Sequence, residues 1–106
     1  MNDIVVVANF RAKEGAETQL LEALRTAVQS TVEEEGCLRY ALHRSTEDPR
    51  NLAMIERWSS SEDLERHLES SHIKTLFSVT APLLQQPAII STWQPLTDDL
   101  GDLARL

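Results

Sequence analysis

Residues 38–58 have the sequence LRYALHRSTEDPRNLAMIERW, which predicts two strands joined by a turn. Apolar and polar side chains alternate over residues 38–44, and this two-residue period is typical of a strand. Residues 46–51 contain aspartate, proline and asparagine, which favour turns because they bond the nearby backbone or fix φ. Residues 52–58 return as a second strand, so we expect an antiparallel hairpin.

The segments on either side of this hairpin predict two further strands and three helices. Gly36 is suited to end the first helix in the left-handed conformation, and the serines at 59–61 with Glu62 are typical of a helix start. We expect strands at 4–10 and 88–93, and helices at 16–35, from 59 to an interruption at Ser70 and Ser71, and from there to about Thr80. The order β-α-β-β-α-α-β predicts an α+β fold with helices on one face of a four-stranded antiparallel sheet.

The first strand is apolar on both of its faces, which predicts a second chain. Val6 and Ala8 lie on one face, and Val5 and Val7 lie on the other. Helices can cover only one face of such a sheet, whereas an antiparallel sheet that faces water should alternate apolar and polar residues. We therefore expect a homodimer that forms through the uncovered sheet faces. The alternative is a lone chain with a somewhat apolar exposed face.

Composition limits the classes of partner and compartment. Seventeen acidic against ten basic side chains give 106 residues a net charge of −7, which argues against nucleic acid and anionic membranes as partners. A single cysteine, Cys37, and the lack of a long apolar segment predict a cytoplasmic protein. We expect one domain over residues 1–96, followed by an acidic tail over 97–106. Leucines at helical spacing suggest that this tail either covers the partner subunit or is a frayed terminus.

Five polar or amphipathic residues occur where core residues are expected. They are Asn9 in the first strand, Glu56 and Trp58 in the third, and His67 and His72 in the last two helices. Because a buried polar group needs a partner or a ligand, these side chains together could line a pocket between sheet and helices.

Each of these residues also has a purely structural interpretation. Asn9 could bond the neighbouring backbone, and Glu56 could pair with Arg39 or Arg57. Trp58 and His67 could be packed core residues, His72 could be an exposed helix-start residue, and the hydroxyl of Tyr40 could reach only the rim of the fold.

Metal and nucleophile sites are weakly supported by the sequence. His67 and His72 are five residues apart, about 140° around a continuous helix, so they cannot share an ion unless Ser70–Ser71 breaks the helix. Cys37 follows a helix-ending glycine near glutamates, which disfavour a thiolate. We therefore expect no metal site and no nucleophilic cysteine.

Several motifs together resemble the antibiotic biosynthesis monooxygenase family. They are Glu35-Gly36-Cys37-Leu38-Arg39-Tyr40, Asp48-Pro49, Glu56-Arg57-Trp58-Ser59-Ser60, and the segment from His67 to His72, with residues 7–15 fitting the family's first strand and turn. The resemblance covers residues 3–95 and implies a ferredoxin-like fold and a dimer whose two sheets form a shared α/β barrel. It also implies oxidation of electron-rich phenols or quinols by dioxygen without a cofactor.

The resemblance also implies roles for individual side chains. His67 or His72 would act as the base that removes a phenolic proton, since histidine titrates near neutral pH. Asn9 and Trp58 would orient the substrate or an oxygen intermediate, and Glu56 would fix a histidine tautomer. The expected substrate contacts, in addition, are Tyr40, Glu56, Leu64 and Phe77.

Two branches of the family suggest different chemistry. Haem-degrading relatives carry a haem-ligating histidine where this chain has Phe77, which cannot bind iron. Another branch, similar at Glu35–Gly36, Glu56, His67 and His72, isomerises a small phosphorylated signalling sugar derivative by proton abstraction. A dimer that binds a small ligand without turnover is the third interpretation.

Overall fold

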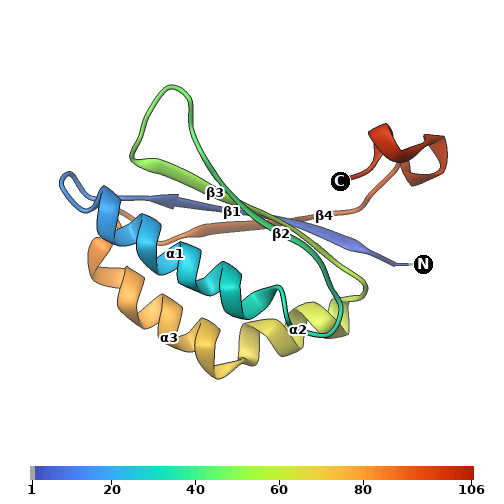
Figure 1. Cartoon of the computed structure of the whole chain (residues 1–106), viewed down its shortest axis with the longest axis horizontal. Coiled ribbons are helices and arrows are strands. Elements are labelled where there is room, and N and C mark those ends of the chain that lie inside the picture. The colour runs from blue at the N-terminus through green and yellow to red at the C-terminus, as the bar shows by residue number, and fades with distance from the viewer. Residues whose placement is uncertain (1) are drawn as a thin grey trace.

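The sheet contains four antiparallel strands, and all three α-helices pack on one of its faces (Figure 1). The computed structural model describes residues 2–106. The strands are β1 (Ile4–Arg11), β2 (Cys37–Arg44), β3 (Asn51–Trp58) and β4 (Ile89–Trp93), arranged in the order β2-β3-β1-β4. The helices are α1 (Glu17–Thr31), α2 (Ser61–Glu69) and α3 (Ser71–Thr80). The predicted α+β fold class and element order are confirmed.

Two helix boundaries differ from the expected ones. Helix α1 ends at Thr31 instead of residue 35, because three consecutive glutamates follow and negative charge is unfavourable at a helix C-terminus. Helix α2 is capped by Ser60 instead of Ser59, since the Ser60 hydroxyl accepts the N–H of Asp63 at 3.1 Å. The expected interruption at Ser70 is present.

The core lies between the helices and the facing side of the sheet. Even-numbered residues of β1 and β3 face the helices, because Val6 pairs with Glu56 and Ala8 with Met54. The bulkiest fully buried side chain is Trp58, at 0% exposure. It is joined by buried residues of two helices, which are Leu20, Leu24, Ala27 and Thr31 of α1 and Ile73, Leu76 and Thr80 of α3.

Leu38 and Leu68 are leucines whose side chains the fold leaves exposed. A register shift between Cys37 and Arg39 disrupts the alternation of β2, and Leu38 is exposed. Leu68 is also exposed, because Asp63, Leu64 and His67 form the buried face of α2.

Among residues 2–106, no α-helix packs on the opposite face of the sheet, which is apolar at its centre. Val7 pairs with Ile55 there, and Ile89 of β4 is 57% exposed on the same face. The two-sided apolar character expected of β1 is therefore confirmed. One end of this face is covered by the C-terminal residues, which fold back beside Val5 (Figure 1).

A buried arginine holds the C-terminal segment in place. The Arg57 guanidinium, on the open face, pairs with the carboxylates of Asp3 and Asp98 and donates to the carbonyl of Leu106. The segment forms two short 3₁₀ turns, Asp98–Leu100 and Asp102–Ala104, instead of a regular helix. The Arg57 guanidinium lowers the pKa of the Asp98 carboxyl by a direct hydrogen bond.

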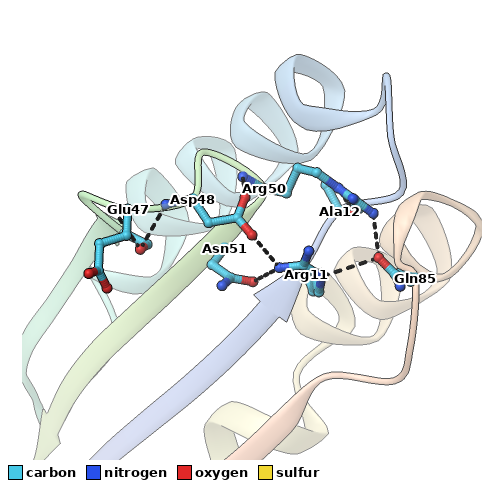
Figure 2. Close-up of polar contacts among 8 residues, drawn as sticks. Arg11, Ala12, Glu47, Asp48, Arg50, Asn51 and Gln85 are labelled. Carbon is cyan, nitrogen blue, oxygen red and sulfur yellow. Dashed lines mark hydrogen bonds and ion pairs between the residues drawn. The ribbon is translucent and has the colours of Figure 1, made fainter.

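A polar cluster closes the end of the sheet at the β2–β3 turn (Figure 2). Arg11, the last residue of β1, donates to Asp48 at 2.7 Å and to Asn51 at 2.8 Å. Arg50 donates to the carbonyl of Ala12 at 2.9 Å and also bonds Gln85. These contacts tie the hairpin turn to the segment that precedes β4.

Among residues 2–106, no helix combines the length and apolar character that crossing a lipid bilayer requires.

Candidate functional site

A single carboxylate oxygen joins the two histidines that the sequence singles out. Oε2 of Glu34 lies 2.8 Å from Nδ1 of His67 and 2.8 Å from Nε2 of His72. His67 is buried against the sheet, whereas the His72 side chain is 30% exposed. The three residues come from the turn after α1, from α2 and from the start of α3, so the site joins separate parts of the helical layer.

The interruption between α2 and α3 brings the histidines together. Ser70 has an extended backbone, with φ −66° and ψ 150°, and its hydroxyl donates to the carbonyl of His67 at 2.6 Å. The continuous-helix angle that would separate His67 from His72 therefore does not apply. Their ring centroids are 6.1 Å apart.

The turn after α1 directs Glu34 towards this pair. The Glu34 N–H donates to the carbonyl of Thr31 at 2.9 Å, and Gly36 follows at φ +86°. The carbonyl of Gly36 accepts the N–H of Ser59 at 2.9 Å, which fixes the turn against the start of α2. A regular helix through residue 35 would not provide these contacts.

Aromatic rings form the wall of the site on the sheet side. The His67 ring lies 4.6 Å from the Trp58 ring and 5.4 Å from the Tyr40 ring, measured between centroids. Trp58 and Tyr40 are both buried. His67 therefore has an apolar, water-poor surrounding on one side and the Glu34 carboxylate on the other.

Burial shifts the titration of the site residues. It lowers the pKa of His67, although the hydrogen bond to Glu34 acts in the opposite direction. Burial raises the pKa of Glu56 to about 7, opposed by the hydrogen bond that the Trp58 indole N–H donates to it at 2.9 Å. Burial also raises the pKa of the Tyr40 hydroxyl. A lowered pKa favours the neutral imidazole of His67.

The contacts with Glu34 define which imidazole nitrogens are free. A carboxylate can only accept hydrogen bonds, so each ring donates from the nitrogen that faces Glu34. In the neutral rings this leaves the lone pairs on Nε2 of His67 and Nδ1 of His72. The site can therefore accept a proton at either of two imidazoles that one carboxylate orients.

A groove between α1 and α3 leads to His72. Its volume is about 430 Å³, and its lining residues include Ala23, Ala27, Ser30, His72, Leu76 and Val79. Small residues on α1 leave the space, and apolar side chains on α3 form the other wall. The exposed edge of the His72 ring is therefore accessible to a small apolar molecule.

The structure brings together five of the predicted site residues: Tyr40, Glu56, Trp58, His67 and His72. Leu64 is buried in the core on the same face of α2 as His67, and Phe77 is half-buried and packs against the core from α3.

Asn9 does not lie in the pocket where the sequence analysis placed it. It is exposed on the open face of the sheet, beside His43, Asn51 and Ala53, because it follows the alternation of Val5 and Val7. It does not line the space between sheet and helices.

The structure changes the roles expected of Glu56 and Trp58. Glu56, expected to fix a histidine tautomer, instead accepts the Trp58 indole N–H, so this N–H is not free to orient a substrate. Neither Arg39 nor Arg57 pairs with Glu56, since both lie on the opposite sheet face.

Glu34 fixes both histidines, and the sequence analysis did not single it out from the neighbouring Glu33 and Glu35. The one available signal was the glycine two residues later, which requires a turn at this point.

Comparisons with known proteins agree with this fold. Residues 3–78 match the model of the family described as "Antibiotic biosynthesis monooxygenase". Rv0793 of Mycobacterium tuberculosis is 28% identical over 95 residues, which are 90% of this chain and 93% of that protein. Its solved structure has a TM-score of 0.84 and covers 89% of this chain and 95% of that one.

Two further relatives support the same likeness. An Escherichia coli protein named "Probable quinol monooxygenase YgiN" is 30% identical over 81 residues, 67% of this chain and 78% of that protein. The crystal structure of PA3566 from Pseudomonas aeruginosa is 30% identical with a TM-score of 0.85, and it covers 91% of this chain and 96% of that one.

Proposed function

Since this chain belongs to the antibiotic biosynthesis monooxygenase family, we propose that it is an enzyme that oxidises an electron-rich phenol or quinol with dioxygen and without a cofactor. The observation that carries the proposal is the pair of imidazoles that share the Glu34 carboxylate, each 2.8 Å from Oε2, beside buried aromatic rings. Relatives named as monooxygenases support the oxygenase class.

The first step is removal of a phenolic proton. The groove beside His72 admits a flat aromatic molecule, and the proton is accepted by Nδ1 of His72 or by Nε2 of the buried His67. Glu34 stabilises the imidazolium that forms, because its carboxylate holds the other ring nitrogen. The buried Tyr40 and Trp58 rings keep this side of the site dry.

The substrate itself then supplies every electron that the reaction needs. The phenolate gives an electron to dioxygen, the two radicals combine at a ring carbon, and the resulting peroxide loses water. One oxygen atom becomes a carbonyl or hydroxyl oxygen of the product quinone. The other leaves as water with two hydrogens from the substrate, so a quinol and one O₂ give a hydroxyquinone and one water.

The active assembly in this proposal is a homodimer formed through the open sheet faces. The antibiotic biosynthesis monooxygenase family is generally dimeric, and the apolar centre at Val7 and Ile55 suits contact with a second chain. The unpaired thiol of Cys37 suits a reducing compartment such as the cytoplasm.

Oxygen uptake by the wild-type chain tests the proposal. A reduced naphthoquinol is supplied in buffer that contains a metal chelator, and the consumption of O₂ is compared with the product formed. We expect one O₂ for each quinol and one ¹⁸O atom in the product when ¹⁸O₂ is used. Absence of enzyme-dependent oxygen uptake with phenols, quinols and anthrones contradicts the proposal.

An isomerase would use the same histidines and carboxylate in a different way. Proton abstraction beside a carbonyl needs a base but no dioxygen. Turnover of a phosphorylated keto sugar under anaerobic conditions, with no oxygen uptake on any phenol, would therefore replace the oxygenase proposal with that one.

A further inference from the structure

We propose that Glu34, His67 and His72 also form a binding site for a divalent transition metal ion such as Zn²⁺, and that the bound ion switches off the proposed oxygenase reaction. The binding of the ion is independent of the proposed function, whereas the inhibition rests on it. The two parts are therefore tested by separate measurements.

The donor atoms already lie at nearly the spacing that a metal needs. Oε2 of Glu34, Nδ1 of His67 and Nε2 of His72 all lie within 4.8 Å of one another, and the carboxylate oxygen is 2.8 Å from each nitrogen. Ligands about 2.0–2.1 Å from Zn²⁺ in a tetrahedral site are separated by roughly 3.3 Å. The ion therefore requires only that Glu34 moves outwards and that the two rings approach each other.

His72 can make most of this adjustment. Its side chain is 30% exposed, and it is the second residue of α3, close to the extended Ser70, so its ring is less restricted than that of His67. His67 is fixed by the Trp58 and Tyr40 rings and provides the rigid ligand.

The donor set suits a borderline metal ion. Two imidazole nitrogens and one carboxylate oxygen are ligands of Zn²⁺ and of other first-row divalent ions, and three protein ligands leave a position for water. The Thr31 hydroxyl lies 3.4 Å from Nε2 of His72 and could support a water at the open position.

The same geometry explains why the ion would be inhibitory. A metal on Nδ1 of His67 moves the ring proton to Nε2, which is the nitrogen that otherwise accepts the proton of the substrate. A metal on Nε2 of His72 similarly places the proton on Nδ1. Both free lone pairs of the metal-free site are then lost.

Calorimetric titration of the chelator-treated full chain with Zn²⁺ tests the site directly. We expect one ion for each chain, and we expect Glu34→Gln to weaken binding by at least the roughly 10- to 100-fold that even outer-shell changes cost. The matched control is Glu33→Gln, because this neighbouring glutamate is exposed. Its affinity should equal that of the wild type.

A second pair of variants tests the same site if Glu34→Gln does not fold. His72→Ala removes a half-exposed ligand and should also weaken binding, whereas His43→Ala removes an exposed histidine on β2 and should not. Circular dichroism confirms the fold of each variant. The site is refuted if Zn²⁺ binds Glu34→Gln and His72→Ala as tightly as the wild type, or if no saturable binding occurs.

Inhibition is measured by oxygen uptake on the naphthoquinol at increasing Zn²⁺, followed by addition of chelator. We expect the rate to fall with the calorimetric occupancy and to recover fully with chelator. Full activity at saturating Zn²⁺ would refute the inhibitory role. A wild-type protein without any quinol activity would refute both the proposed function and the inhibitory role of the ion. The calorimetric titration would still show whether the metal-binding site exists.

Discussion

At the scale of single residues, the buried Glu56 connects the site to stability. Its carboxyl accepts the Trp58 indole N–H inside the core, and burial raises its pKa from an ordinary 4.5 to about 7. In the unfolded chain Glu56 loses its proton near the ordinary pKa, whereas the folded chain keeps the proton to about pH 7. The free energy of unfolding therefore decreases as pH rises through this interval.

Replacing Glu56 by glutamine removes this ionisation and keeps an oxygen that can accept the indole N–H. Each pKa unit corresponds to about 1.4 kcal/mol. As pH rises from 5 to 8, the free energy of unfolding of Glu56→Gln should therefore increase by roughly 1–3 kcal/mol relative to that of the wild type. Urea unfolding at the two pH values and one protein concentration measures this gain. A Glu56→Gln protein with the same pH dependence as the wild type and the exposed control Glu33→Gln would contradict this explanation.

His67 and His72 could be predicted from the sequence because histidines on the apolar side of a helix need a polar partner. Glu34 could not, because its position depends on where α1 ends and not on its own spacing. Asn9 was misplaced because it shares the face of Val5 and Val7, and the sequence does not show that this is the face that the helices leave uncovered.

At the scale of elements, the turn after α1 determines whether the site forms. Gly36 has φ +86°, and a Cβ added to it would lie 2.2 Å from Cγ of Asp63. Asp63 also bonds the hydroxyls of Ser59 and Ser60 at the start of α2. Any side chain at position 36 therefore disturbs two helices at the point where they hold Glu34 near His67.

Two alanine variants separate the steric contribution from the backbone contribution. Gly15 has a similar φ of +88° but has no atom within 4 Å of an added Cβ. Gly15→Ala should lower the free energy of unfolding by only about 1–2 kcal/mol, because alanine disfavours the left-handed backbone. Gly36→Ala should lower it by roughly 2–4 kcal/mol, because Asp63 must also move. Urea unfolding of both proteins checks this order. Equal losses would show that the contact with Asp63 has no energetic effect.

The strands could be predicted to about one residue at each end, because alternation and β-branched residues mark them, whereas the register shift between Cys37 and Arg39 in β2 could not. The helix ends depend on interactions outside the helix. The contact of Gly36 with α2 and the hydrogen bond of Ser70 to His67 both form only after folding, and these two contacts create the site.

At the scale of the whole molecule, the open sheet face is the proposed dimer surface. Ile55 lies at its centre, paired with Val7, while Ile90 lies on the helix side of β4 and is 44% exposed. Ile55→Glu should raise the dissociation constant of the dimer by at least about 100-fold, because it places a charge in an apolar interface. The matched variant Ile90→Glu should leave the constant unchanged.

Sedimentation velocity over a concentration series distinguishes these outcomes. A wild type that stays monomeric at all concentrations, or an Ile55→Glu protein that dimerises normally, would show that the open faces do not associate. The C-terminal segment held by Arg57 lies at one end of this face, beside Val5 and Val7, so it leaves Ile55 and Ile89 available.

The central claim is that His67 and His72, oriented by Glu34, accept the proton that makes the substrate reactive towards dioxygen. The most direct test is the initial rate of oxygen uptake on a naphthoquinol, with chelator present, for His67→Ala, His72→Ala, the double variant and the exposed control Glu33→Gln. We predict that the double variant of His67 and His72 loses roughly 10²- to 10⁴-fold in rate, while Glu33→Gln keeps the wild-type rate. A double variant that consumes oxygen as fast as the wild type would contradict the claim.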